Sequence, residues 1–222
     1  MRAGLIATLS IAVAAVAGIA IGDDALPVAF ADKATGAITT GATRPTPAGN
    51  PARDYLSPAE RSRGQQYGLL PAGTKSLLRT PKRMSHGDYD WNEDGVPPGQ
   101  LTVWVDLRTQ ILSVFRGGHE IGTAVIVYGA ETMKSPLGRF PILSKQRDYH
   151  SRSYDAPMPY SLFITDTGVA LHGSPMSSRR ATHGCIGLPT EFARLLFAAA
   201  KTGDEVHIVR SDTTMAMAAR GR

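Results

Sequence analysis

The chain has 222 residues and a formal net charge of +5 at pH 7; 42% of its residues are hydrophobic and 7% are aromatic. Its Lys and Arg residues are scattered and form no basic stripe, so the composition argues against a partner made of nucleic acid. A mildly positive chain of this kind is instead attracted to anionic polymers, of which a bacterial cell wall is one.

The N-terminal segment, residues 1–31, is expected to be a signal peptide. Arg2 precedes a run of weakly polar to apolar residues from Leu5 to Ile21, and Ala29-Phe30-Ala31 has the small residues of a cleavage site. The alternative is a retained anchor, because a run of about 17 residues reaches the lower limit for a spanning helix. We therefore expect a periplasmic or cell-envelope location, with anchoring to the inner membrane if the signal is not cleaved.

The next segment, residues 32–98, is rich in Pro, Gly and polar residues and poor in apolar runs. Such a segment buries too little apolar surface to offset its ordering entropy, so we expect a flexible linker. A short helix is expected within it from Pro58 to about Tyr67, with Ser57 as its N-cap. The linker would let the following domain reach wall strands from its starting point.

The pattern changes at Leu101, where short apolar or alternating segments predict a β domain over residues 99–210. One helix is expected from Thr190, as its N-cap, to Lys201. Residues 211–222 are expected to form a C-terminal tail. A hairpin is expected from 101–105 and 111–115, and further strands at 122–129, 138–143, 161–165, 168–172 and 206–209.

Cys185 is the only cysteine in the sequence. An exported chain with one cysteine cannot form an internal disulfide, so the thiol is either buried and inert or used in chemistry. A cysteine nucleophile needs an imidazole to take its proton, and His172 and His183 lie close in sequence. The strand 168–172 would end at His172, and the loop after it could lay Cys185 alongside. Gly184 has no Cβ and would let backbone N–H groups point at a developing oxyanion.

Metal sites fit the sequence poorly. Residues 88–95, DYDWNEDG, match the opening of an EF-hand calcium loop, but the twelfth position counted from Asp90 is Leu101 rather than the bidentate Glu that the loop requires. Zinc needs three or four ligands, and His183 and Cys185, two residues apart, are placed awkwardly for one tetrahedral ion. We therefore expect no metal and no organic cofactor.

Residues 172–189, HGSPMSSRRATHGCIGLP, resemble the signature of the YkuD-type L,D-transpeptidase catalytic domain, in which His-Gly is followed by a loop and by Ser/Thr-His-Gly-Cys. Three further segments match in the order of that family: VWVDLRTQILSVFRGGHEIGTAVIVYG, KSPLGRFPIL and APMPYSLFI. The resemblance covers roughly residues 100–210. It implies a mainly β fold, a β-sandwich of mixed sheets with one or two short helices, preceded by a flexible N-terminal segment.

The resemblance also implies roles for the motif residues. Cys185 would be the nucleophile, and His172 would be its base, oriented through the backbone carbonyl of Gly173. The Arg that this family often has two residues after the cysteine is replaced here by Gly187, so another arginine would have to grip a carboxylate, with Arg179 and Arg180 as candidates from the loop. Substrate contacts are implied for His183, Thr182, Tyr160, Met158 and Arg180.

The implied function is that of an exported peptidoglycan L,D-transpeptidase, which forms 3→3 crosslinks through a cysteine thioester and releases D-Ala from tetrapeptide stems. Its partners would be peptidoglycan stem peptides, and a monomer is expected. The same site would also suit an L,D-carboxypeptidase or the attachment of wall proteins. A cysteine endopeptidase or amidase is disfavoured, because in such hydrolases the cysteine generally precedes the histidine. A catalytically silent wall-binding module is a further alternative. We expect instead a low-pKa thiolate at Cys185, and its fast alkylation near neutral pH would contradict that alternative.

Overall fold

The structure is a computed structural model that describes residues 50–80, 83–129, 134–176 and 182–212. Over these ranges the fold is mainly β, as the resemblance implies, with two sheets and two short helices. No helix in the described ranges is long and apolar enough to cross a membrane. The expected signal peptide, the first part of the expected linker and most of the C-terminal tail lie outside the described residues.

The larger sheet has eight strands. They are β1 (Arg53–Tyr55), β2 (Ser76–Leu78), β3 (Tyr89–Trp91), β4 (Leu101–Asp106), β5 (Ile111–Arg116), β6 (His119–Val125), β7 (Gly138–Pro141) and β12 (Glu205–Val209). Their order is β1-β2-β6-β5-β4-β12-β7, with β3 also paired to β6. The hairpin expected at the start of the β domain is β4–β5. The last strand, β12, pairs parallel with β4 and antiparallel with the edge strand β7. The first and last strands of the expected β domain, β4 and β12, are therefore neighbours in the sheet.

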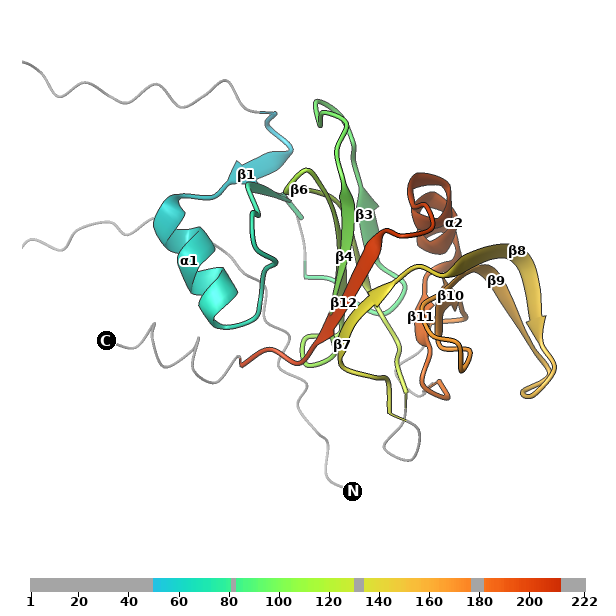
Figure 1. The fold of residues 1–222 in the computed structure, drawn as a ribbon. Helices are drawn as coiled ribbons and strands as arrows, with labels where there is room; N and C mark the ends of the chain where they lie inside the picture. Colours follow the sequence, from blue (N-terminus) through green and yellow to red (C-terminus); the bar gives the residue numbers. More distant parts are fainter. Residues whose placement is uncertain (1–49, 81–82, 130–133, 177–181, 213–222) are drawn as a thin grey trace, which may run out of the picture.

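The smaller sheet has four strands: β8 (Ser144–Ser151), β9 (Ala156–Phe163), β10 (Ala170–Gly173) and β11 (Ile186–Leu188), in the order β11-β10-β9-β8. The β10–β11 pair is parallel and the other pairs are antiparallel. Strand β8 was not expected, because its sequence SKQRDYHS is mostly exposed and lacks apolar alternation. The β8–β9 hairpin extends away from the body of the molecule (Figure 1).

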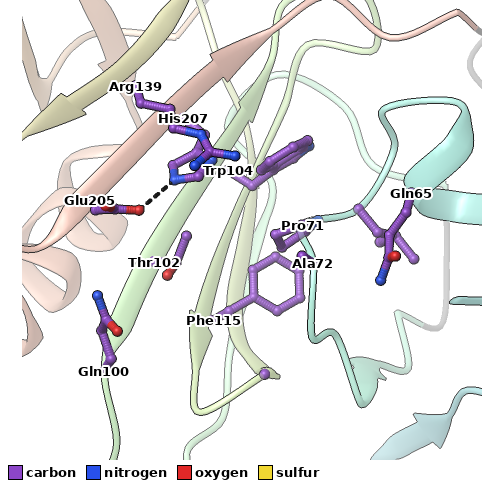
Figure 2. Close-up of a pocket in the computed structure, with 12 residues that line it drawn as sticks. Gln65, Pro71, Ala72, Gln100, Thr102, Trp104, Phe115, Arg139, Glu205 and His207 are labelled. Carbon is purple, nitrogen blue, oxygen red and sulfur yellow. Dashed lines mark hydrogen bonds and ion pairs between the residues drawn. The ribbon is translucent and has the colours of Figure 1, made fainter. Parts of the chain in front are cut away.

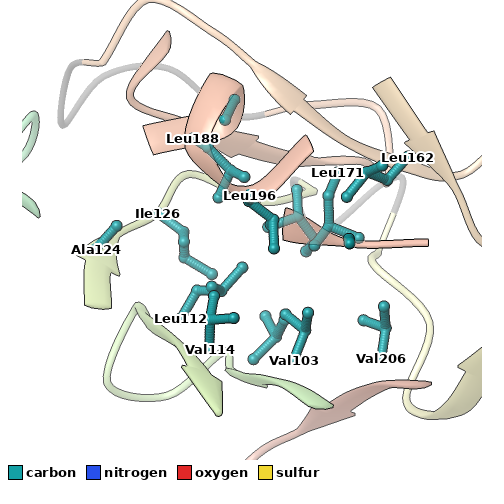
Figure 3. Packing of buried hydrophobic residues seen from close by; sticks show 14 of the residues in the cluster. Val103, Leu112, Val114, Ala124, Ile126, Leu162, Leu171, Leu188, Leu196 and Val206 are labelled. Carbon is teal, nitrogen blue, oxygen red and sulfur yellow. The ribbon is translucent and has the colours of Figure 1, made fainter. Parts of the chain in front are cut away.

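The hydrophobic core fills the space between the two sheets and α2 (Thr190–Ala199). Figure 3 shows side chains of both sheets meeting there. Burial of each such aliphatic side chain contributes about 1.5–3 kcal/mol, so this interface is the main source of the fold's stability. Its members include Val103, Leu112, Val114, Leu162, Leu171, Leu188, Leu196 and Val206, all at most 1% exposed.

Helix α2 differs from the expectation at its start. Its N-cap is Pro189, which makes no side-chain cap hydrogen bond, and Thr190 is the first helical residue. At the other end Lys145 of β8 donates hydrogen bonds to the carbonyl oxygens of Phe197 (2.6 Å) and Ala200 (2.5 Å). Carbonyls at a helix C-terminus have no partner within the helix, so this lysine caps α2 and ties it to the smaller sheet.

The expected helix in the N-terminal segment is present as α1 (Pro58–Gln66). Ser57 is its N-cap: its hydroxyl accepts a hydrogen bond from the backbone N–H of Glu60, and the Glu60 carboxylate accepts from the N–H of Ser57 at 2.7 Å. This reciprocal pair is a capping box, which satisfies two N–H groups at the helix start. Helix α1 lies on the side of the larger sheet opposite to the smaller sheet (Figure 1).

Residues 50–80 and 83–98 are part of the fold, which differs from the flexible linker expected over 32–98. Polar contacts rather than apolar runs hold them. Arg53 is 3% exposed, and its guanidinium donates to the backbone carbonyls of Glu120 and Asn92. The backbone N–H of Leu78 in turn donates to the Glu120 carboxylate at 2.8 Å. Composition does not reveal such contacts, because they depend on a few groups that meet only in the folded chain.

Candidate active site

His172 and Cys185 lie on neighbouring segments of the smaller sheet. In the parallel β10–β11 pair, Leu171 is opposite Ile186 and His172 is opposite Gly187. Extending this register by one residue places Cys185 opposite Ala170, two residues before His172. Because side chains alternate between faces, His172 and Cys185 share the face that points away from the core. One strand spacing across and two residues along put their Cα atoms about 8 Å apart.

The imidazole of His172 is fixed by its neighbour. Its Nδ1 lies 2.9 Å from the carbonyl oxygen of Gly173. A carbonyl only accepts, so Nδ1 carries the hydrogen and Nε2 of the neutral ring is left as a base. Burial lowers the pKa of His172, and the hydrogen bond to Gly173 opposes that effect. The ring, 8% exposed, is therefore neutral and oriented in the resting protein.

The thiol of Cys185 is half-buried at the end of the loop that leads into β11. Its Sγ lies 3.8 Å from the carbonyl oxygen of Gly168, in the turn between β9 and β10, and no hydrogen bond joins it to His172. Burial raises the pKa of the Cys185 thiol, and a hydrogen bond from the backbone of Ala170 opposes the shift. This differs from the low-pKa thiolate expected from the sequence: both partners are held in their neutral forms.

The loop carrying the thiol is held on both sides. The backbone of Gly187 exchanges two hydrogen bonds with Val127, of 2.7 and 3.0 Å, on the edge of β11 opposite to β10. The N–H of Thr182 donates to the carbonyl of Tyr128 at 3.1 Å, and the Thr182 hydroxyl donates to the carbonyl oxygen of Cys185. Thr182 thus braces the turn through the backbone of the cysteine.

Two glycines give this turn its shape. Gly184 is buried and has a φ of 104°, a conformation that glycine adopts far more readily than other residues. Gly187 leaves no room for a side chain, because a Cβ there would lie 2.6 Å from Val127 Cγ2 and 2.9 Å from Ser174 Cβ. The Arg that the family often has at this position would therefore not fit in this backbone. Arg179 and Arg180, its expected substitutes, lie outside the described residues.

His183 is exposed, and its ring stacks on that of Tyr154 with centroids 4.1 Å apart and 10° between the planes. Tyr154 belongs to the turn of the β8–β9 hairpin, so this contact brings the hairpin tip beside the cysteine loop. Tyr154 was not expected at the site. No local signal in the sequence indicates it, because its partner is 29 residues away and its own hairpin was not expected.

Tyr160 and Met158 lie on β9. The Tyr160 ring packs edge-on against Phe197 of α2, with centroids 5.9 Å apart. Its φ of 57° marks a kink in the strand. Met158 is 7% exposed and is paired with Tyr149 in the hairpin. Thus the structure brings His172, Gly173 and the 182–185 turn together, with Tyr160 and Met158 on the neighbouring strand β9.

The structure shows no cluster of metal-ligating side chains among the residues that it describes. No three His, Cys, Asp or Glu side chains there gather as a metal ion would require. The acidic segment that resembles a calcium loop contains β3, and Trp91 Nε1 donates to Glu93 at 2.9 Å within it. Glu93 of this segment also pairs with Arg116 of β5.

Comparison with known proteins agrees with this reading of the fold and motif. The family model described as YkuD, the L,D-transpeptidase catalytic domain, matches residues 100–208. The matched residues are therefore those of an L,D-transpeptidase catalytic domain by family likeness. No curated protein matches the sequence.

Several solved L,D-transpeptidases are similar to the chain. LdtMt1 in complex with imipenem is 25% identical, with a TM-score of 0.47, over 49% of this chain and 58% of its own. The enzyme from Stackebrandtia nassauensis is 25% identical, with a TM-score of 0.47, over 53% and 60%. A mutant of the Enterococcus faecium enzyme is 27% identical, with a TM-score of 0.45, over 50% of each chain. The chain thus spans between half and three fifths of the length of these structures.

Proposed function

We propose that this protein is an exported peptidoglycan L,D-transpeptidase that forms 3→3 crosslinks through a thioester on Cys185. One observation carries the proposal: the β10–β11 register puts the only cysteine of the chain on the same outward face as a histidine whose Nδ1 is bound by the carbonyl of Gly173. That arrangement supplies a nucleophile and a base with a free nitrogen, as cysteine acyl transfer requires. The match of the family model to residues 100–208 supports the same activity.

In the first half-reaction the thiol of Cys185 attacks the carbonyl carbon that joins the L-centre of diaminopimelate to the terminal D-Ala of a tetrapeptide stem. Nε2 of His172 takes the thiol proton as the C–S bond forms. The oxygen of the tetrahedral intermediate is stabilised by backbone N–H groups of the 183–185 turn. When the intermediate collapses, the C–N bond breaks and the imidazolium gives its proton to the leaving amine. D-Ala departs, and the rest of the stem remains bound to Cys185 as a thioester.

In the second half-reaction an amine of a neighbouring stem attacks the thioester carbonyl. His172 takes a proton from that amine, the C–S bond breaks, and the proton returns to the sulfur, so the site is restored. Water in place of the amine would give an L,D-carboxypeptidase, and an amine of a wall protein would give protein attachment. The two half-reactions need no metal and no organic cofactor.

The neutral resting pair fits this order of events. Burial disfavours both the thiolate and the imidazolium, so the proton moves when substrate is present rather than beforehand. The thiol, 3.8 Å from the carbonyl oxygen of Gly168, also has to turn towards His172. Hydrogen bonds of catalytic groups are often long in ligand-free structures and shorten when substrate binds.

The remaining parts of the proposal concern place and partners. The apolar run before Ala31 would export the chain to the periplasm, where stem peptides of peptidoglycan are the substrates. Anchoring to the inner membrane would follow if the signal is retained. A single copy of the domain carries every group named in the two half-reactions, so we propose that it acts as a monomer.

The test is incubation of the purified protein with disaccharide tetrapeptide, followed by mass spectrometry. We expect crosslinked dimers, free D-Ala and a transient adduct on Cys185. Cys185→Ala should show none of these while keeping its circular dichroism spectrum, because a half-buried thiol contributes little packing. Free D-Ala without dimers would assign a carboxypeptidase. An unmodified Cys185 with no D-Ala released by the folded protein would overturn the proposal.

A further inference from the structure

A groove of about 410 Å³ lies on the outer face of the larger sheet, away from the candidate active site. Figure 2 shows strands β4, β5, β7 and β12 as one wall and the chain after α1 as the other. Pro71 and Ala72 come from that chain, and Gln65 comes from α1 itself. The volume lies within the range of small-molecule sites, about 300–1,000 Å³.

The register of the sheet explains which side chains face the groove. Thr102 of β4 is opposite both Phe115 of β5 and Glu205 of β12, and the three form one row across the sheet. Two residues further along β4, Trp104 is opposite His207 of β12. These residues alternate with the buried core residues of the same strands, so they point outwards together.

The second row continues onto β7, where Arg139 is opposite His207. The rings of Trp104 and His207 pack against each other, 5.4 Å apart and tilted by 39°, and the half-buried Trp104 ring lines the groove. His207 Nε2 lies 2.8 Å from a carboxylate oxygen of Glu205, as the dashed line in Figure 2 marks. The hydrogen bond from His207 lowers the pKa of Glu205, which therefore stays an acceptor at neutral pH.

These groups suit a sugar better than a charged or an apolar ligand. Arg139 and Glu205 oppose each other in charge, and the groove adds the amides of Gln65 and Gln100 and the hydroxyl of Thr102. Amides, a carboxylate and a guanidinium pair with hydroxyl and acetamido groups at the edge of a sugar ring. An aromatic surface packs against the C–H face of such a ring, because it is apolar and rigid.

We propose that this groove binds a short stretch of a β-1,4-linked amino-sugar chain. The choice of wall glycan among sugars rests on the proposed function. The groove opens from the outer face of one sheet and the thiol from the outer face of the other, with the core between them. The glycan held in the groove therefore belongs to a different part of the wall from the stem at Cys185, and the groove holds the domain on its polymer between reactions.

The experiment is a titration of the full chain with the tetramer of N-acetylglucosamine, a peptide-free probe, by calorimetry and tryptophan fluorescence. We expect saturable binding with a change in fluorescence, because Trp104 lines the groove. Maltotetraose, an α-linked glucose chain of the same length, should bind at least about tenfold more weakly. No binding of the tetramer up to about 10 mM, or equal binding of maltotetraose, would overturn the proposal.

Variants locate the site. Arg139→Ala and Gln100→Ala change exposed side chains of the groove, and each should raise Kd by about 2–10-fold, the effect of a lost hydrogen bond. Arg147→Ala and Gln146→Ala change exposed residues of the same types on β8 and should leave Kd unchanged. Equal losses in the two pairs would also overturn the proposal. Because no turnover is measured, this test can fail while D-Ala release succeeds, or the reverse.

Discussion

The ring of Tyr154 lies parallel to the imidazole of His183, with centroids 4.1 Å apart. One ring comes from the turn of the β8–β9 hairpin, and the other lies two residues before Cys185. The hairpin otherwise extends away from the body of the molecule, so this stack connects its tip to the candidate active site (Figure 1). Through this contact the tip of the hairpin borders the turn that carries the thiol, where the proposed substrate would bind.

Removing this stack should weaken substrate handling without unfolding the protein. In Tyr154→Ala we expect kcat/KM for D-Ala release to fall by about 2–10-fold, because an aromatic pair contributes about 0.5–1.5 kcal/mol. Steady-state kinetics with disaccharide tetrapeptide would measure the change. Tyr154→Phe keeps the ring and should stay within about twofold of the wild type. If the Phe variant loses as much as the Ala variant, the hydroxyl rather than the stack is responsible.

The pH dependence of acylation tests the neutral pair of His172 and Cys185. Burial lowers the pKa of His172, so the neutral base should persist to a pH below its ordinary value of about 6.5, and the acid limb of the rate should lie there. Burial raises the pKa of Cys185, so the thiolate should form unaided only above its ordinary range. We therefore expect a broad plateau between these limits for acylation by imipenem, followed by mass spectrometry of the adduct.

His172→Gln sharpens this test. Without the base, acylation should depend on thiolate formed by solvent, so at pH 7 the rate should drop by about 10²–10⁴-fold, the usual contribution of general base catalysis. The deficit should shrink steadily as the pH rises towards the raised pKa of Cys185. His150→Gln, on the exposed part of β8, serves as the control and should behave as the wild type. A His172→Gln variant with a normal plateau would remove the imidazole from the mechanism.

Sequence patterns found the parts of the fold where apolar side chains alternate. The hairpin β4–β5 was expected almost to the residue, and α1 was expected from its capping serine. The strands β1, β2 and β8 were not expected, because buried Arg53 and the mostly exposed face of β8 leave no apolar signal. Elements held by polar contacts or lying at an exposed edge need the tertiary structure to be seen.

The candidate site likewise has features that the sequence predicts and features that only the structure shows. Residue type and motif spacing singled out Cys185, His172 and the 182–184 turn. They gave the wrong direction for the pKa of the thiol, because desolvation depends on how many atoms pack around the sulfur in the folded chain. Nor did they indicate Tyr154, whose partner lies in another element. A local motif reveals which side chains can react, whereas their pKa shifts depend on packing that only the folded structure shows.

Gly187 provides a test of packing beside the site. Gly187→Ala adds a Cβ within 2.6 Å of Val127 and 2.9 Å of Ser174, so one strand has to shift. Such overpacking costs about 1–3 kcal/mol, and urea denaturation should show a loss of that size in the free energy of unfolding. Gln146→Ala, exposed in the same sheet, should change it by less than about 0.5 kcal/mol. Equal stability of Gly187→Ala and the wild type would show that β11 shifts freely against Val127.

Glu120 makes the stability of the fold depend on pH. Burial raises the pKa of this carboxyl to about 7, while hydrogen bonds from Ser113 and Leu78 and the charge of Arg53 oppose the shift. The folded state therefore holds a proton that the unfolded chain releases near its ordinary pKa of about 4.5. Stability from this group is complete below that pH and is lost as the pH rises to about 7, by an amount on the order of 3 kcal/mol.

Replacement by the isosteric amide isolates this effect. Glu120→Gln cannot ionise, and its carbonyl oxygen can still accept the N–H of Leu78, so its free energy of unfolding should lack the decline between pH 5 and 7.5. Urea denaturation at several pH values would measure both proteins, with Glu191→Gln, an exposed residue of α2, as the control that keeps the decline. Parallel curves for the wild type and Glu120→Gln would mean that this carboxyl ionises alike in the folded and unfolded chains.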